Sequence, residues 1–331
     1  MRKIMDQASQ LGIVIVLIGL VIAFSILSPH FLEAGNLFNI GKQIATLGIC
    51  AVGFGFVLIT GGIDLSLGYQ ISINVVVCGI LMTQFALPWY LAVLAVLVLG
   101  VVIGLINGFI ISTTGVAPLI VTLAMATVLN GISYLLSQGL PIYGFPASFS
   151  VLGQGSFFGV PISLFFLIAV WAVGFVILTK TSIGRYFYAI GNNSEASRLS
   201  GVNTKRTIMI VYALAGLFTA IGAVLLLSRL NSAQSSTGAG FEFSVLTACV
   251  LGGISVMGGR GTLIGAFVGV LIVGVLDNGL VLLNVSEYIQ LVVKGVILLA
   301  AVIYDTRSKS AKGRSMKIGG ISLKSPTLVK A

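Results

Sequence analysis

Apolar residues along the chain gather into ten long windows separated by short polar or turn-rich stretches. The windows cover about residues 11–28, 43–60, 66–85, 89–111, 118–137, 161–179, 207–228, 242–258, 262–284 and 286–304. A membrane-spanning helix takes about 20 mostly apolar residues, and the windows are close to that length. The pattern therefore predicts an all-α polytopic membrane protein with about ten transmembrane helices.

The first window follows Arg2 and Lys3, as the apolar core of a secretory signal does. However, it is long, lacks a small-x-small cleavage pattern and leads into further windows, so we expect an uncleaved helix. Residues 1–304 are thus expected to form a single transmembrane domain, followed by a basic cytoplasmic tail over residues 305–331.

Positive charge is divided unevenly between the two sides that ten spans create. An even number of spans places both termini on one side, and the segments on that side carry fifteen Lys and Arg residues. The segments on the other side carry two, Lys42 and Arg229, while Lys294 lies within the last window. Because cytoplasmic loops are enriched in Lys and Arg, we expect both termini in the cytoplasm.

The composition excludes a water-soluble globular fold. Of 331 residues, 57% are hydrophobic and 8% are charged, and the mean hydropathy is +1.14, whereas soluble domains carry about 25% charged residues. Such a chain cannot cover its surface with polar groups. The net charge of +10 comes from loop and tail residues rather than from a folded basic patch, so no nucleic-acid partner is expected.

Residues suited to covalent chemistry are scarce. The single histidine, His30, lies near a window boundary, the three cysteines lie within apolar windows, and no Cys/His cluster has metal-ligand spacing. The sequence contains no phosphate-binding loop ending in Gly-Lys-Ser/Thr. We therefore expect no enzyme activity and no metal or cofactor on this chain. Uphill transport would draw its energy from an ion gradient or from another subunit.

The loop 180–206 carries the most charge before the tail and contains a marked short helix. Asn192 followed three residues later by Glu195 is typical of a helix N-terminus, and Gly201 is typical of a left-handed helix end. A helix of two turns is marginal in water by itself. It therefore needs a partner surface, either another protein or the membrane.

A carboxylate interrupts the apolar sequence at Asp64, in the glycine-containing segment 61–68 between the second and third windows. An ionisable residue at the centre of a membrane helix costs about 2.5–3.5 kcal/mol, so Asp64 must face a turn, a cavity or a partner. We expect Asp64 and Ser66 to cap the third helix by accepting its free N–H groups. A second role in a transport pathway is compatible with capping.

Two rows of glycines recur at every fourth residue. Small residues at this spacing let two membrane helices approach backbone to backbone. The rows therefore predict close helix packing, either within the bundle or between two copies of the chain. They are Gly100, Gly104 and Gly108 in the fourth window, and Gly261, Gly265 and Gly269 in the ninth.

Four motifs in order give the chain a resemblance over essentially its whole length to the permease subunits of ribose-type ABC importers. They are TGGIDLSLG at 60–68, GVAPLIVTL at 115–123, AIGNNSEASRLSG at 189–201 and LGGISVMGGRG at 251–261, the last followed by DNGL at 277–280. Two positions depart from the family pattern: Ala124 stands where relatives commonly have Gly, and Asp277 where many have Asn. These departures bear on packing or substrate fit rather than on membership.

The resemblance implies a transport subunit of the bacterial plasma membrane with a helix bundle like that of the cobalamin-importer permeases. It implies an assembly of two permease chains, either a homodimer or a pair of close homologues, surrounded by membrane lipids. In such an assembly two cytoplasmic ATPases bind ATP and Mg²⁺, and an extracytoplasmic sugar-binding protein delivers the substrate. The ATPase-coupling residues implied by the family's Glu-Ala-Ala…Gly loop are Asn192, Glu195, Ala196, Arg198 and Gly201.

Two other functions stay open at this point. One is a permease for branched-chain amino acids or nucleosides on a related ABC scaffold. The other is an ion-coupled secondary transporter that uses Asp64 or Asp277 as a proton or sodium site. The capped helix in the loop 180–206 favours an ABC permease, because an ion-coupled carrier has no ATPase to dock.

Polar side chains within the windows are the candidates for lining a substrate pathway. Each has an alternative role in an interhelical hydrogen bond, worth about 0.6 kcal/mol on average. Neutral groups suit an uncharged hydroxylated solute, so Asn74 and Thr122 are the leading candidates. The full set is Asp64, Gln70, Asn74, Asn107, Thr122, Asn130, Asp277, Asn278 and Asn284.

Overall fold

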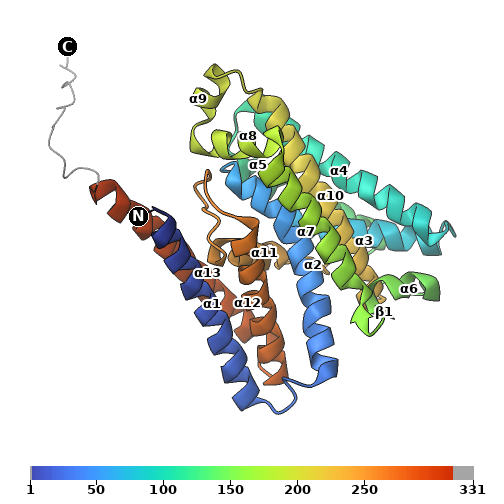
Figure 1. Ribbon diagram of the computed structural model, residues 1–331. Helices are drawn as coiled ribbons and strands as arrows, with labels where there is room; N and C mark the ends of the chain where they lie inside the picture. The colour runs from blue at the N-terminus through green and yellow to red at the C-terminus, as the bar shows by residue number, and fades with distance from the viewer. Residues whose placement is uncertain (1, 316–331) are drawn as a thin grey trace.

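The computed structural model describes residues 2–315 and is built almost wholly from helices (Figure 1). A two-residue hairpin, β1 (Ser156–Phe157) and β2 (Val160–Pro161), interrupts them. The helices are α1 (Arg2–Leu27), α2 (Ala34–Ile59), α3 (Leu67–Thr83), α4 (Trp89–Thr114), α5 (Pro118–Ser137), α6 (Ala147–Gln154), α7 (Ile162–Lys180), α8 (Ser182–Asn192), α9 (Ser194–Leu199), α10 (Thr204–Leu230), α11 (Phe241–Leu251), α12 (Leu263–Leu282) and α13 (Glu287–Ser315).

The polytopic all-α prediction is confirmed. Six helices, α2, α4, α5, α7, α10 and α12, are long and apolar enough to cross a membrane, by length and composition. The shortest of them has 19 residues, which at 1.5 Å per residue is about 28 Å and matches a hydrocarbon core of about 30 Å. The count of ten spans and the side on which the termini lie stay predictions. The tail residues 316–331 lie outside the described residues.

The window 242–258 is only partly helical. Helix α11 ends at Leu251 after 11 residues, a length of about 16 Å that covers roughly half of the hydrocarbon core. From Gly252 to Thr262 the chain is irregular, and Gly253, Gly258, Gly259 and Gly261 have left-handed backbone angles that favour glycine. The glycine-dense sequence therefore ends α11 inside the apolar window.

Buried helices form the centre of the bundle, and apolar side chains cover its outside. In α2, 89% of the apolar window is buried, against 28% in α5 and in α7. The outer helices expose large apolar residues such as Leu94, Leu135 and Ile168. This distribution suits a lipid surround, because hydrocarbon is a good solvent for these side chains and a poor one for polar groups.

The first glycine row packs within the chain. It lies against α10, where a Cβ on Gly100 would come within 2.6 Å of the Ala220 Cβ and one on Gly108 within 2.8 Å of the Met209 Cα. Gly104 faces Tyr212 and Ala213 in the same interface. The two backbones are thus in direct contact, as small residues at every fourth position allow.

The second glycine row, Gly261, Gly265 and Gly269, packs two helices together as predicted, except at Gly261. Gly265 and Gly269 hold α12 against the end of α11, and a Cβ on Gly269 would be 2.9 Å from the Gly252 nitrogen. Gly261 precedes the N-cap of α12 and has φ +130. It therefore serves the irregular loop, where it packs against Ile254, rather than a helix interface.

The segment between α5 and α7 packs on the end of α10. It contains α6 and the hairpin, in which Phe157 pairs with Val160. The Gly153 N–H donates to Ser228 Oγ of α10 at 2.7 Å, and Ile142 forms an antiparallel bridge with Ala233 beyond α10. In Figure 1 this segment lies toward the end of the bundle opposite α8 and α9.

Candidate functional site: a buried polar cluster and an adjoining loop

The break between α2 and α3 holds the buried carboxylate of Asp64, which is 3% exposed. Its Oδ1 accepts hydrogen bonds from the Ser66 backbone N–H at 3.0 Å and from Ser66 Oγ at 2.5 Å. Ser66 is the N-cap of α3, but its side chain caps none of the helix N–H groups. The capping interpretation is therefore wrong in detail: Asp64 holds the turn before α3 closed and accepts no N–H of the helix itself.

Two neighbouring helices hold this break in place. Asn107 of α4 donates from Nδ2 to Ser66 Oγ at 3.0 Å. Thr122 of α5 accepts the Leu65 N–H at 3.1 Å and donates to the Ile63 carbonyl at 3.0 Å. Asn107 and Thr122 are both fully buried. The structure thus brings three of the predicted pathway residues, Asp64, Asn107 and Thr122, into one hydrogen-bonded group.

Further polar side chains lie one and two turns along α3. Gln70 and Asn74 are 1% and 0% exposed, and their amide groups have no hydrogen-bond partner among the residues that the structure describes. Helix α5 packs against α3 and contributes the half-buried Asn130 and the buried Ser133, each with an unpaired oxygen. Leaving such a buried group unpaired costs about 1–3 kcal/mol. We call Asp64, Gln70, Asn74, Asn107, Thr122 and Asn130 the buried polar cluster.

Glu242, which the sequence analysis did not single out, extends this region onto α11. It is 6% exposed, and its Oε2 has no hydrogen-bond partner in the described part of the chain. A Cβ on Gly68 would collide with its carboxylate. The connection after α10 brings Glu242 there, because the Gly238 N–H donates to Ser72 Oγ at 3.0 Å. The sequence did contain a signal for Glu242, because it is a carboxylate at the first position of the apolar window 242–258.

Asp277 and Asn278 lie in a different place from the buried polar cluster. Asp277 Oδ2 forms an ion pair with Lys294 Nζ at 3.0 Å, which joins α12 to α13. The Asn278 and Asn36 amides exchange hydrogen bonds at 2.8 and 2.9 Å, which join α12 to α2. Asn284 is exposed just after α12. The pairing of Asp277 was detectable in principle, because Lys294 is the oppositely charged residue within the next window.

The loop between α7 and α10 contains two helices, α8 and α9, in place of the single short helix expected at 192–201. The N-cap of α9 is Asn193, whose Oδ1 accepts the Ala196 N–H at 2.9 Å. Asn192 is instead the last residue of α8, and its Nδ2 donates to the Tyr188 carbonyl at 2.7 Å. The capping prediction for Asn192 is therefore wrong by one residue. Asn193 takes the role because its extended backbone, φ −163 and ψ 103, suits an N-cap.

The exposed face of α9 carries one ion pair. Arg198 donates two hydrogen bonds to the Glu195 carboxylate, at 2.6 and 3.0 Å. These bonds, with the nearby positive charge, lower the pKa of Glu195 below its ordinary value. Glu195 therefore does not reach back to the start of the helix as a capping box requires. Gly201 has φ +88, as predicted for the residue that ends the helix.

Helix α8 contacts the C-terminal end of α2, close to Asp64. The charge bias predicts that this end of α2 faces the cytoplasm. A Cβ on Gly191 would lie 2.5 Å from the Gly259 nitrogen, and the Gly259 N–H donates to the Ile59 carbonyl at 2.8 Å. The Tyr188 hydroxyl donates to the Gly261 carbonyl at 2.8 Å. Residue 59 is five positions before Asp64. Helix α8, the 252–262 loop and the α2–α3 break thus form one junction.

Comparison with known proteins identifies the family. A family model described as branched-chain amino acid transport system / permease component matches residues 36–302. The ribose import permease protein RbsC of Bacillus subtilis (strain 168) is 42% identical over 295 residues, which cover 88% of this chain and 91% of the relative. The L-arabinose transport system permease protein AraH of Escherichia coli (strain K12) is 39% identical over 92% of each chain.

A third relative is the galactose/methyl galactoside import permease protein MglC of Escherichia coli (strain K12), which is 37% identical over 91% of this chain and 95% of its own length. No solved structure matches the chain. The family model and the relatives span nearly all the apolar helices described above. The chain therefore belongs to this family of ABC importer permeases and is a multi-pass membrane transport subunit.

Proposed function

We propose that the chain moves a monosaccharide across the bacterial plasma membrane as the permease subunit of an ABC importer. An extracytoplasmic binding protein delivers the sugar, and separate ATPase subunits supply the energy. Relatives named for ribose, L-arabinose and galactose support this substrate class. The observation in the structure that carries it is the group of neutral amide and hydroxyl side chains buried between α3, α4 and α5.

The buried polar cluster is proposed to line the pathway. Each amide of Gln70, Asn74, Asn107 and Asn130 offers both donors and an acceptor, which are the complements of sugar hydroxyl groups. The unpaired amide atoms of Gln70 and Asn74 are able to take such partners without giving up a protein hydrogen bond. Thr122 and Asp64 are proposed to shape the pathway through the α2–α3 break that they hold.

Asp277 and Asn278 are proposed to hold helices together rather than to contact substrate. Both side chains have partners on neighbouring helices, Lys294 and Asn36. The Lys294 ammonium already neutralises the Asp277 carboxylate, which disfavours a proton or sodium site there. This pairing speaks against an ion-coupled mechanism that uses Asp277.

The loop 180–206 is proposed to dock on the ATPase, with ATP and Mg²⁺ bound on that partner. Asn192, Glu195, Ala196, Arg198 and Gly201 would shape the docking surface. Movement of the loop would be transmitted to α2 through the contact of Gly191 with Ile59 and Gly259. From the end of α2 it would be transmitted to the break at Asp64. ATP drives the cycle only insofar as the ATP-bound partner interacts differently with the two permease conformations.

A second permease chain, identical or closely homologous, is proposed to complete the assembly. Amino acids and nucleosides are the second candidate substrate class. The description of the family model names branched-chain amino acids. The amide side chains of the buried polar cluster favour sugar over an amino acid, because an amino acid brings two charged groups that these amides would not neutralise.

The test is reconstitution of the chain with its ATPase in vesicles, supplied with a panel of extracytoplasmic binding proteins. Uptake of radiolabelled ribose, arabinose, galactose, leucine and uridine is then measured with and without ATP. We expect ATP-dependent uptake of a monosaccharide. Uptake of leucine or uridine in its place would support the second class, and uptake driven by an ion gradient without ATP would refute the proposal.

A further inference from the structure

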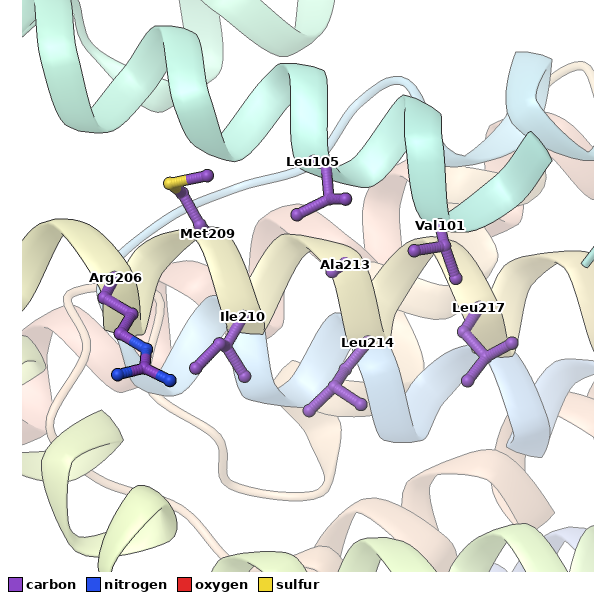
Figure 2. Close-up of a pocket in the computed structure, with 8 residues that line it drawn as sticks. All are labelled: Val101, Leu105, Arg206, Met209, Ile210, Ala213, Leu214 and Leu217. Atoms are coloured by element: carbon purple, nitrogen blue, oxygen red, sulfur yellow. The ribbon is translucent and has the colours of Figure 1, made fainter. Parts of the chain in front are cut away.

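An apolar groove runs between α4 and α10 on the outside of the bundle (Figure 2). Its volume is about 310 Å³. Val101 and Leu105 line it from α4, and Ile210, Ala213 and Leu217 are among the residues that line it from α10. Arg206 lies at one end of this row of apolar side chains, as Figure 2 shows.

The close approach of the two helices accounts for the groove. A Cβ on Gly216 of α10 would lie only 2.9 Å from the Gly100 carbonyl carbon and 3.3 Å from the Gly104 Cα. Glycines at the line of contact leave no side chains to fill the space beside it. Larger side chains line the two sides of the groove, such as Leu105 of α4 and Ile210 of α10, and the small Ala213 lies between them.

The length of the groove matches one leaflet of a bilayer. From Arg206 to Leu217 there are 11 positions along α10, a rise of about 16 Å. The hydrocarbon core of a bilayer is about 30 Å thick, so one leaflet supplies about half of that. A single lipid acyl chain lying in the groove would therefore reach from the membrane surface to the bilayer midplane.

The charge at the end of the groove selects the headgroup. Arg206 is exposed in the first turn of α10, where the span meets the membrane surface, and its guanidinium has no ion-pair or hydrogen-bond partner among residues 12–303. A free cation above an apolar groove complements an anion that carries an apolar chain. We propose that this groove is a binding site for an anionic phospholipid, with one acyl chain against α4 and α10 and its phosphate held by Arg206.

The site rests on chemistry separate from transport of sugar. Arg206 ends the loop 180–206 but is not one of the five named docking residues. Neither it nor the lining residues belong to the buried polar cluster or to α9. An occupant here would fill the space between α4 and α10 and stabilise their contact. Its presence should therefore be seen in the stability and lipid content of the permease, with no need for ATP, substrate or partner subunits.

The experiment compares lipid retention by the purified permease in detergent. The probes are phosphatidylglycerol and phosphatidylcholine with the same acyl chains, and the readouts are bound lipid by native mass spectrometry and the midpoint of thermal unfolding. We expect the wild type to retain phosphatidylglycerol preferentially and to be stabilised by it. Arg206→Gln should lower that retention about fivefold, the effect of one cation near a lipid surface, and leave phosphatidylcholine unchanged.

Two further variants make the result decisive. Lys205→Gln removes an equal charge from the adjacent position, which does not line the groove, so it should keep the preference. Ala213→Phe fills the floor of the groove and should lower retention of both lipids. The proposal is overturned if Lys205→Gln and Arg206→Gln lose phosphatidylglycerol equally, which would indicate general surface attraction. It is also overturned if Ala213→Phe folds normally and retains both lipids at wild-type levels.

Discussion

Replacement of Gly201 gives a direct test of the proposed docking loop, because its cost can be worked from its surroundings. Gly201 has φ +88, and no atom lies within 4 Å of the place where a Cβ would stand. The Cβ of a valine would meet no atom of another part of the chain, so the cost worked here is that of the backbone. For an L-residue in the left-handed region that cost is about 1–2 kcal/mol, which changes an equilibrium by about 5–30-fold.

This backbone cost would act on α9, a helix with little stability of its own. Helix α9 has six residues, far fewer than an isolated helix needs for stability. A Cβ at Gly201 would meet no atom of the bundle. We therefore expect Gly201→Val to reduce the population of α9 in its docking conformation while the bundle stays folded. Because apparent affinity falls with the competent fraction, ATPase binding should weaken, by at most about 30-fold.

The assay titrates the ATPase against the permease in nanodiscs and follows binding and substrate-stimulated ATP hydrolysis. Gly201→Asn is the matched control, since asparagine adopts the left-handed conformation more readily than most residues, and it should behave nearly as wild type. Glu195→Lys, which breaks the pair with Arg198, should also weaken binding. If Gly201→Val and Glu195→Lys both bind the ATPase and couple hydrolysis normally, α9 is no docking element and a place on the membrane surface becomes the better interpretation.

Three further predictions concern the membrane-embedded residues and the topology. Asp64→Asn should reach the membrane in normal amounts but lose most uptake, because it removes the carboxylate charge while its amide oxygen can still accept the two Ser66 hydrogen bonds; unchanged uptake kinetics would contradict this. Lys294→Met should lower the midpoint of thermal unfolding, since it leaves the Asp277 carboxylate unpaired, and the double variant with Asp277→Asn should recover much of the loss; equal midpoints for the single and double variants would show that the pair contributes nothing. Reporter fusions to the C-terminal tail should be cytoplasmic, and an external reporter would overturn the predicted count of spans.

The sequence by itself determined the class of the protein, because transfer of a helix into hydrocarbon depends on a local sum over about 20 residues. All ten apolar windows contain a helix, although the last part of 242–258 is irregular. Local backbone geometry was also readable where a residue type permits it, as at Gly201. The four ordered motifs indicated the family, which the family model and the relatives confirm.

The tertiary structure alone decided the pairing of polar groups. Asp277 finds its partner 17 positions away at Lys294, and Asn278 finds Asn36 across 242 positions. The periodicity of one helix carries no information about which face of another it meets. For the same reason the glycine row from Gly100 predicted a close contact but not that its partner would be α10.

The candidate site shows the same division. Asp64 and Thr122 were recognisable as polar residues in apolar surroundings, yet the connection that runs from α10 back to α3 brings Glu242 beside Gly68. The choice of Asn193 over Asn192 as the cap depended on one pair of backbone angles where α8 ends. Composition and hydropathy are sums along the chain and need no fold. Hydrogen bonds and ion pairs depend on positions to within an ångström, which only the packed helices supply.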